Sequence, residues 1–362
     1  MMTHFQQLPP EVKCMILSYL KEKKDLFNAA LVCSEWSNLV NIPSMWKDFH
    51  LDITIEKVCN VNEMIDSPRF KGMRKVRLAG DLTEEAVENV CSRLLAHDNN
   101  IEELHLINTN LVKLDLSMLL KKFSMINIYE CFVDQDLLEK MMKEMPHPDT
   151  KLRSLYLGET DLTRVSVDYF PSFSVLSSLE IGGYNIPTIS SSQLEALFSI
   201  FSVANNLKVF QLYNVDLSPL PPKLFEAAVR SLEALRLALC DVTTSQLEAM
   251  LEVISTKEAT NLTNLQLLES LDKIQPELLS AAVTKVEKVG LQVNLVEQDE
   301  QVKHLLMKIA SEDAEKMRLQ HLTFVDIYYL VPYMNNALVE AKKKVKKLLV
   351  TSSYDDDLWI NE

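Results

Sequence analysis

The side chains that most often carry chemistry, histidine, cysteine and paired carboxylates, are spread through this sequence without a catalytic spacing. The seven histidines form no HxxxH or HExxH pattern and the six cysteines form no CxxC pair, so a zinc site is not expected. A phosphate-binding loop needs several clustered glycines, but the only adjacent pair is Gly182-Gly183. A GxSxG nucleophile elbow is also absent. We therefore expect no metal, no cofactor and no catalysis by this chain, and we interpret Cys131 and Cys240 as structural.

Residues 8–49 stand out because they are predicted to be helical and unlike the rest of the chain. Pro9-Pro10 favours a helix start, since the fixed φ of proline suits the first helical turn. Helical spacing then gives one apolar face, made of Leu8, Val12, Met15, Ile16, Tyr19 and Leu20. Asp25 is placed to cap a second helix, and Pro43 ends this region. About 40 helical residues are too few to fold alone, so the segment must pack against a partner, the rest of the chain, or both.

The order of the residues in this segment resembles the F-box motif. The residues that carry the resemblance are Leu8-Pro9, Glu11, Ile16, Leu20, Leu26, Val32-Cys33, Trp36 and Trp46. The resemblance implies docking to the Skp-type adaptor and cullin scaffold of an SCF ubiquitin ligase. It implies adaptor-binding roles for Leu8, Pro9, Ile16, Leu20, Leu26 and Val32 and core roles for Trp36 and Trp46. The alternative is that all of these residues belong to an intramolecular core.

The chain beyond Met73 repeats. The template LxxLxLxxxxL fits eleven places, from Met73 to the unit that begins at Val345, and the start-to-start spacings alternate between long and short, from 22 to 33 residues. In each unit the xLxL core predicts a short strand, and the following residues predict a helix. One unit cannot bury its apolar face alone, so stacked units should form a curved solenoid.

These units resemble leucine-rich repeats of the ribonuclease-inhibitor-like type. That family places a small or polar residue at the ninth template position, where it bonds backbone groups. The residues here are Asp81, Thr109, Cys131, Thr160, Tyr184, Val215, Cys240, Ser270, Asn294, Ile327 and Ser353. Tyr184, Val215 and Ile327 depart from the pattern. The predicted fold class is therefore α/β: a helical F-box domain (1–50), a linker or cap (51–72), a solenoid of about eleven strand–helix repeats with the parallel sheet inside and the helices outside (73–351), and an acidic tail (352–362).

The concave face of such a solenoid is the predicted binding surface for a protein target. Template positions five and seven point out of the sheet there, and tyrosine and arginine are typical interface anchors. The predicted contact residues are Arg77, His105, Tyr129, Tyr156, Tyr213, Arg236 and Gln266. The alternative is an ordinary solvated sheet.

Composition limits the partners and the compartment. The net charge of −14 disfavours nucleic acid, and no stretch of 18 apolar residues predicts a membrane span. Dispersed cysteines predict reduced, mostly buried thiols and a cytoplasmic or nuclear protein. The tail 352–362 is interpreted either as a solvated cap on the last repeat or as a segment that folds across the concave face.

Two functional hypotheses follow from these patterns. The first is a non-catalytic substrate-recognition subunit of an SCF-type ubiquitin ligase, which holds an unknown protein target for ubiquitin-dependent degradation. The second is a non-degradative scaffold or inhibitor that binds a protein partner through the repeats.

Overall fold

The structure is a computed structural model of residues 1–362. It describes residues 7–57, 60–96, 99–111, 114, 116–184, 189–203, 205–256, 260–268, 271, 273–292, 299–312, 317–325 and 331–351. The chain divides into two compact units, Met1–Tyr156 and Leu157–Glu362.

The first unit begins with short helices and continues as alternating strands and helices. Its first elements are α1 (Pro10–Leu17), α2 (Lys23–Ala30), α3 (Ser34–Val40), the 3₁₀-helix η2 (Pro43–Trp46), β1 (His50–Ile53), α4 (Val61–Ile65) and η4 (Phe70–Gly72). It continues with β2 (Lys75–Leu82), α5 (Glu84–Ala96), β3 (Glu103–Thr109), α6 (Leu116–Lys122), β4 (Met125–Tyr129) and α7 (Gln135–Glu144). Strands β1 to β4 are parallel neighbours in chain order. Strand β5 (Ser154–Gly158) lies at the division between the units.

The second unit continues the same alternation. It contains η5 (Val167–Val175), β6 (Ser178–Gly182), α8 (Ser191–Ser199), η6 (Ile200–Ser202), β7 (Val209–Tyr213), α9 (Pro222–Ser231), β8 (Ala234–Ala238), α10 (Thr244–Ser255) and β9 (Asn264–Leu268). It ends with α11 (Pro276–Val283), β10 (Lys288–Gln292), α12 (Asp299–Ser311), β11 (His321–Val325), α13 (Val331–Lys342) and β12 (Lys347–Thr351). From β6 to β12, strands that follow each other in the chain pair in parallel.

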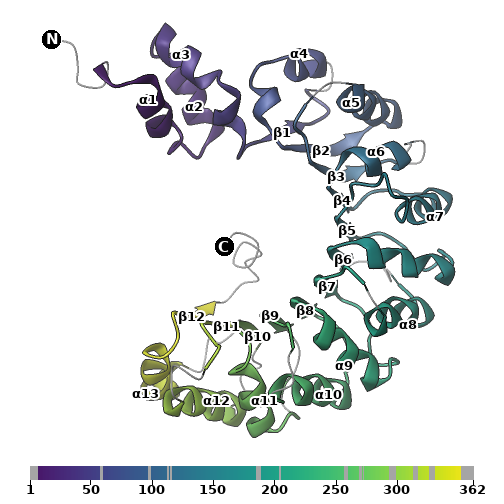
Figure 1. The fold of residues 1–362 in the computed structure, drawn as a ribbon, viewed down its shortest axis with the longest axis vertical. Helices are drawn as coiled ribbons and strands as arrows, with labels where there is room; N and C mark the ends of the chain where they lie inside the picture. The colour runs from purple at the N-terminus through teal and green to yellow at the C-terminus, as the bar shows by residue number, and fades with distance from the viewer. Residues whose placement is uncertain are drawn as a thin grey trace. The chain divides into compact units, whose positions relative to one another are not determined.

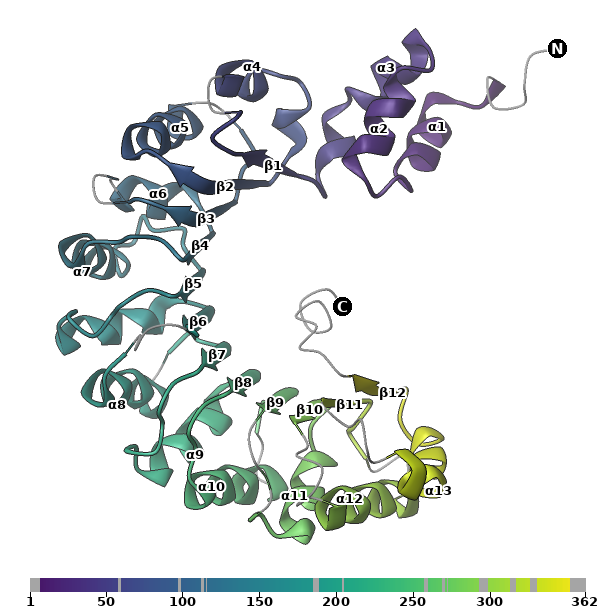
Figure 2. The ribbon, with the colours of Figure 1, turned by 180° about the vertical axis from the view of Figure 1, so that it is seen from behind.

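In each unit the helices that follow the strands cover one face of the sheet (Figures 1 and 2). The fourth and sixth template positions face these helices and form the core; Leu104 and Leu106 in β3, for example, are fully buried. Positions three, five and seven point to the opposite face, here called the open face. The predicted fold class is confirmed as an N-terminal helical module followed by parallel strand–helix units.

A tight turn at the end of the strand recurs in six of the described repeats. The eighth template position has a positive φ at Gly80, Asn108, Glu130, Glu159, Asn214 and Leu239. A positive φ is costly for residues other than glycine and asparagine, so this turn is a strong local requirement of the repeat.

The residue at the ninth template position follows this turn. Thr109, Cys131, Thr160 and Cys240 are buried there, and the Cys131 thiol donates to the Leu106 carbonyl oxygen of the preceding unit at 3.2 Å. Burial raises the pKa of the Cys131 thiol, which agrees with a structural role. Three predicted ninth-position residues, Ser270, Asn294 and Ile327, lie outside the described residues, as do Ser353 and the tail 352–362.

The helices of the second unit begin in two alternating ways. Helices α9 and α11 start with Pro222 and Pro276, whereas α8 and α10 carry a glutamine at their third residue in a capping box. These glutamines, Gln193 and Gln246, are almost fully buried. Each side-chain amide nitrogen donates to two backbone carbonyl oxygens of the preceding strand–helix repeat. Helix α12 repeats the device, because Gln301 donates to the Ile274 carbonyl oxygen at 3.5 Å.

Candidate functional site

The N-terminal helices enclose a small core of their own. Trp46 is fully buried, and its indole nitrogen donates to the Val40 carbonyl oxygen at 2.6 Å. The ring of Trp46 lies 5.4 Å from that of Phe27 and 5.5 Å from that of Phe49 between centroids. Leu26 is also fully buried. Trp46, with its N–H hydrogen-bonded and its ring packed against two aromatic side chains, is therefore the main residue of this small core.

Contacts beyond residue 50 hold this core against the first strand. The guanidinium of Arg69 lies 4.7 Å from the centroid of the Phe27 ring, and its Nε donates to Asn41 Oδ1 at 2.8 Å. Gly72 is also close to the backbone of η2, since a Cβ built at Gly72 would lie 1.7 Å from the Pro43 carbonyl oxygen. Lys23 pairs with Asp52 of β1 at 2.7 Å. The helical module and the start of the sheet are therefore packed together within the first unit.

The apolar side of α1 faces solvent. Leu17 is 2% exposed and the Lys13 side chain 3% exposed, so these two residues face inward, and Lys13 pairs with Glu35 at 2.5 Å. Met15 is 57% exposed and Tyr19 is 76% exposed. The sequence predicted one apolar face but did not predict its direction. A lysine stem with a satisfied ammonium packs inward and leaves the larger apolar side chains outside.

The predicted adaptor-binding residues differ in exposure. Pro9, Ile16 and Val32 are exposed, and Leu8 and Leu20 are partly exposed. Leu26, by contrast, has no exposed surface in this structure, and we assign it to the core of the module. Sequence reasoning missed Leu31, which is 83% exposed at the end of α2 beside Val32. The sequence around Leu31 does not predict this exposure, because a single leucine after a helix is just as often part of a core.

Comparison with known proteins agrees with this description of the N-terminal segment. The F-box-like family model matches residues 5–52, which span α1, α2, α3 and η2 and reach into β1. A comparison with curated proteins gave no match. The chain therefore carries an F-box-like domain at its N-terminus, followed by repeated parallel strand–helix units.

The open face of the first unit carries charged side chains in register. Arg77, His105 and Asn127 lie side by side on β2, β3 and β4, as the template predicted. Next to them, Glu103 pairs with Lys75 at 3.1 Å and lies 3.6 Å from His105. Partial burial would raise the pKa of Glu103, but hydrogen bonds from His105 and Lys75 outweigh it and hold the pKa below its usual value.

Beside this column, β1 carries a second polar pair. His50 Nε2 lies 3.0 Å from Asp52 Oδ1, and Lys23 also bonds Asp52. Burial and then the charge of Lys23 lower the pKa of His50. Burial would raise the pKa of Asp52, but the Lys23 hydrogen bond and the neighbouring positive charges lower it overall. The result is a polar surface in which acids and bases alternate.

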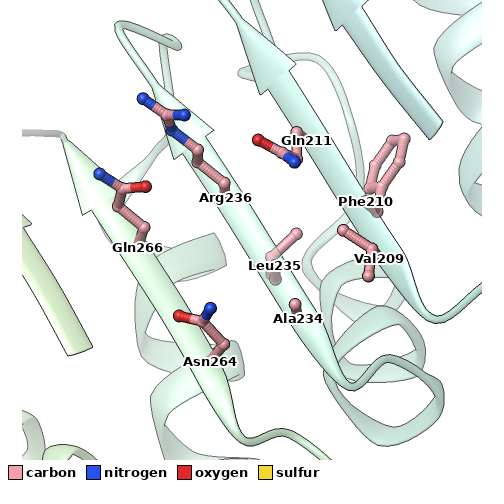
Figure 3. Close-up of a pocket in the computed structure, with 8 residues that line it drawn as sticks. All are labelled: Val209, Phe210, Gln211, Ala234, Leu235, Arg236, Asn264 and Gln266. Atoms are coloured by element: carbon pink, nitrogen blue, oxygen red, sulfur yellow. The ribbon is translucent and has the colours of Figure 1, made fainter. Parts of the chain in front are cut away.

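The open face of the second unit contains a small pocket over β7, β8 and β9 (Figure 3). Gln211, Arg236 and Gln266 occupy equivalent positions on these strands and line a cavity of about 140 Å³. The Arg236 guanidinium lies 4.5 Å from the centroid of the Tyr213 ring, a cation–π arrangement. The predicted side-by-side placement of these residues is confirmed.

The burial of the predicted target-binding residues was not foreseen. Arg77 is exposed, and His105, Tyr129, Tyr156 and Tyr213 are half-buried. Arg236 is only 8% exposed and Gln266 only 6% exposed, although their sequence positions indicated an open surface. Arg77 in the first unit is therefore far more accessible than Arg236 and Gln266 in the second, a difference that a periodic template cannot express.

No group of three or more histidine, cysteine or acidic side chains is arranged to hold a metal ion among the residues that the structure describes. In the same residues, none of the helices combines the length and the apolar character needed to cross a membrane. Of the described cysteines, Cys91, Cys131 and Cys240 are buried, Cys14 is partly exposed and Cys33 is exposed.

Proposed function

We propose that this chain is the substrate-recognition subunit of an SCF-type ubiquitin ligase. The F-box-like domain binds a Skp-type adaptor, which links it to the cullin scaffold, and the open face of the repeats binds a protein target. The chain contributes position and no catalytic group, since a target held near a charged ubiquitin-conjugating enzyme reacts faster through effective concentration and orientation.

The exposed apolar side chains of α1 and of the turn that follows it are the observation that carries the proposal. Met15, Ile16 and Tyr19 are 57%, 40% and 76% exposed in a domain that the F-box-like family model matches. Large apolar side chains grouped in one short exposed segment mark a protein-interaction site, because water contact with them is unfavourable. Leu31 and Val32, 83% and 63% exposed, form a second group at the end of α2. Together with Pro9 and Leu8, these residues are the proposed adaptor contacts.

Adaptor binding by the full chain tests this proposal. The variant Ile16→Ala/Tyr19→Ala should weaken binding to a purified Skp-type adaptor by a factor of about 10 to 100, the usual effect of removing interface anchors. The matched control is Met118→Ala, which trims a 48% exposed side chain on α6 and should leave adaptor binding unchanged. Because the altered side chains are exposed, the stability of the variant should stay close to that of the wild type.

The outcomes separate the two functional hypotheses. An absence of wild-type binding at micromolar concentrations contradicts the ligase function and leaves the scaffold or inhibitor hypothesis. Equal losses in the α1 variant and in the Met118 control would contradict the assignment of the surface to α1. A Leu26→Ala variant should instead lower stability, because Leu26 is fully buried in the module.

The target is proposed to bind the open face of the first unit. Arg77 is exposed there and His105 and Tyr129 are partly exposed, and tyrosine and arginine are frequent interface anchors. The alternating charges of β1 to β3 favour a target surface that itself carries both signs of charge.

A further inference from the structure

The pocket over β7, β8 and β9 has the size of one side chain (Figure 3). Its volume is about 140 Å³, whereas pockets that hold drug-sized molecules measure about 300–1,000 Å³. An apolar cavity of about 150 Å³ holds one benzene molecule. The ligand of this pocket is therefore a single small group, such as one side chain or the end of a chain, and the rest of a larger ligand lies outside it.

The hollow forms because one residue in a row of three is small. Val209, Ala234 and Asn264 lie in register on the three strands, and the middle residue contributes only a methyl group. The next row toward the carboxyl ends of the strands consists of Gln211, Arg236 and Gln266. Figure 3 shows both rows around the space above Ala234. The floor of the pocket is thus small and apolar, and one wall is polar.

The polar wall has the chemistry of a carboxylate site. Arg236 is the only charged residue among the eight that line the pocket, and the amide groups of Gln211, Asn264 and Gln266 also donate hydrogen bonds. The Arg236 guanidinium stacks 4.5 Å from the centroid of the Tyr213 ring, which fixes the plane of its N–H donors. An arginine donates two parallel hydrogen bonds to a carboxylate in that plane. A carboxylate therefore fits this wall better than a neutral or cationic group.

The charges around the pocket favour the same ligand. Arg236 is 8% exposed, and an anion is attracted more strongly by a charge among packed side chains than by one in bulk water. Lys288 adds a positive charge on β10, the strand next to β9. Two acids occur on or beside the neighbouring strands: Glu233 pairs with Lys208 at 2.6 Å, and Glu180 is on β6, two strands from Arg236. Neither acid lines the pocket, so the pocket itself is positively charged.

We propose that this pocket binds a carboxylate of the protein target, so that the second unit selects targets by one acidic group. The Arg236 guanidinium binds the carboxylate, Gln211 and Gln266 flank it, and Ala234 leaves room for the carbon atoms that carry it. An acidic side chain and the carboxyl end of a chain both present this group. The inference rests on the proposed function only in assigning the carboxylate to a target, since carboxylate binding itself is a property of the free chain.

Ligand-observed NMR with the full chain and model compounds tests the inference at constant ionic strength. N-acetylglutamate N-methylamide presents an acidic side chain, N-acetylalanine presents a chain end, and N-acetylglutamine N-methylamide is the neutral control. The compound that matches the natural source should bind with a Kd of about 1 mM, as expected for about fourteen heavy atoms at the usual ligand efficiency. The neutral control should bind at least about tenfold more weakly. Tighter binding of one carboxylate identifies the source.

Two substitutions at partly exposed positions locate the binding without removing Arg236. Ala234→Leu fills the hollow and should weaken carboxylate binding at least about tenfold. Gln211→Glu places a carboxylate of the chain itself next to Arg236 and should weaken binding by a similar factor, through competition at high effective concentration. The matched controls on the first unit are Ala79→Leu on β2 and Asn127→Glu on β4, which should have no effect. Circular dichroism checks that each variant is folded.

The results separate this inference from the proposed function. The Ile16→Ala/Tyr19→Ala variant should bind the model carboxylates like the wild type, so a failure of adaptor binding does not affect this test. No saturable binding of either carboxylate below about 10 mM overturns the inference, as does equal affinity for the glutamate and glutamine compounds. Wild-type affinity in folded Ala234→Leu and Gln211→Glu also overturns it, because the bound carboxylate is then elsewhere.

Discussion

The buried glutamine at the start of α10 permits a quantitative test of how the repeats are joined. Gln246 is 1% exposed, and its amide nitrogen donates to the carbonyl oxygens of Leu217 and Leu220 at 2.8 and 2.5 Å. Its amide oxygen accepts from the backbone N–H of Thr243 at 2.7 Å. One side chain thus joins the helix of one repeat to the loop of the preceding repeat.

The cost of Gln246→Ala follows from which groups lose their only protein partner. The Leu217 oxygen keeps a hydrogen bond from the Leu220 N–H at 3.0 Å, and Thr243 is only half-buried, so water replaces its lost acceptor. The buried Leu220 oxygen loses the hydrogen bond from Gln246. A buried acceptor without a donor costs about 1–3 kcal/mol, and the lost packing adds to this, so we expect a loss of about 3 kcal/mol.

Urea unfolding with circular dichroism measures the change, and hydrogen exchange shows where it occurs, because a repeat array can unfold in parts. The matched control is Gln135→Ala in α7, where an exposed glutamine donates to Glu139 at 3.0 Å; its effect should stay within about 0.5 kcal/mol. Gln246→Glu should destabilise the protein at neutral pH and recover in part in acid, where the protonated carboxyl can donate. If Gln246→Ala costs no more than the control, the glutamine does not join the units.

The remaining predictions concern backbone strain and pH. Leu239 has a φ of 56° and is 37% exposed, so Leu239→Gly should raise the unfolding free energy by about 1 kcal/mol, measured by urea unfolding; a loss of stability would show that side-chain contacts outweigh the strain. Burial and Lys23 lower the pKa of His50 below 6.5, so its contribution to stability is present above that pH and is lost as the pH falls through the lower folded-state pKa. His50→Gln should therefore reduce the decline in unfolding free energy between about pH 7 and pH 5, measured by urea unfolding at several pH values. An unchanged slope of unfolding free energy against pH would refute this.

The repeat could be predicted from the sequence because its signal is regular. The xLxL spacing gave the strands and their register, so Arg77 lies beside His105 and Arg236 beside Gln266 as expected. The left-handed turn before the ninth position was not predicted, since Glu130 and Leu239 are unusual residues for it. Stacking of the units imposes that turn, and local preference alone does not reveal it.

The candidate sites were harder to predict because burial depends on what packs against each residue. Leu26 fits the F-box pattern but lies in the core, whereas Lys13 is buried by its pairing with Glu35. Arg236 occupies an open-face position and is nevertheless 8% exposed. A periodic pattern assigns each residue to a face, but it does not state how much of each side chain its neighbours cover.

The alternation of helix starts in the second unit bears on how such a chain grows. Gln193, Gln246 and Gln301 recur in every second unit, and each donates to the loop of the unit before it. Prolines begin the intervening helices. The element that recurs here is therefore a pair of strand–helix repeats of about 55 residues. Only the pair contains both the glutamine donor and the loop whose carbonyl oxygens accept from it. Duplication of such a pair of repeats keeps the alternation of glutamine and proline helix starts. Gain or loss of a single repeat instead places two helices of the same kind next to each other, so that one buried glutamine loses its acceptor loop.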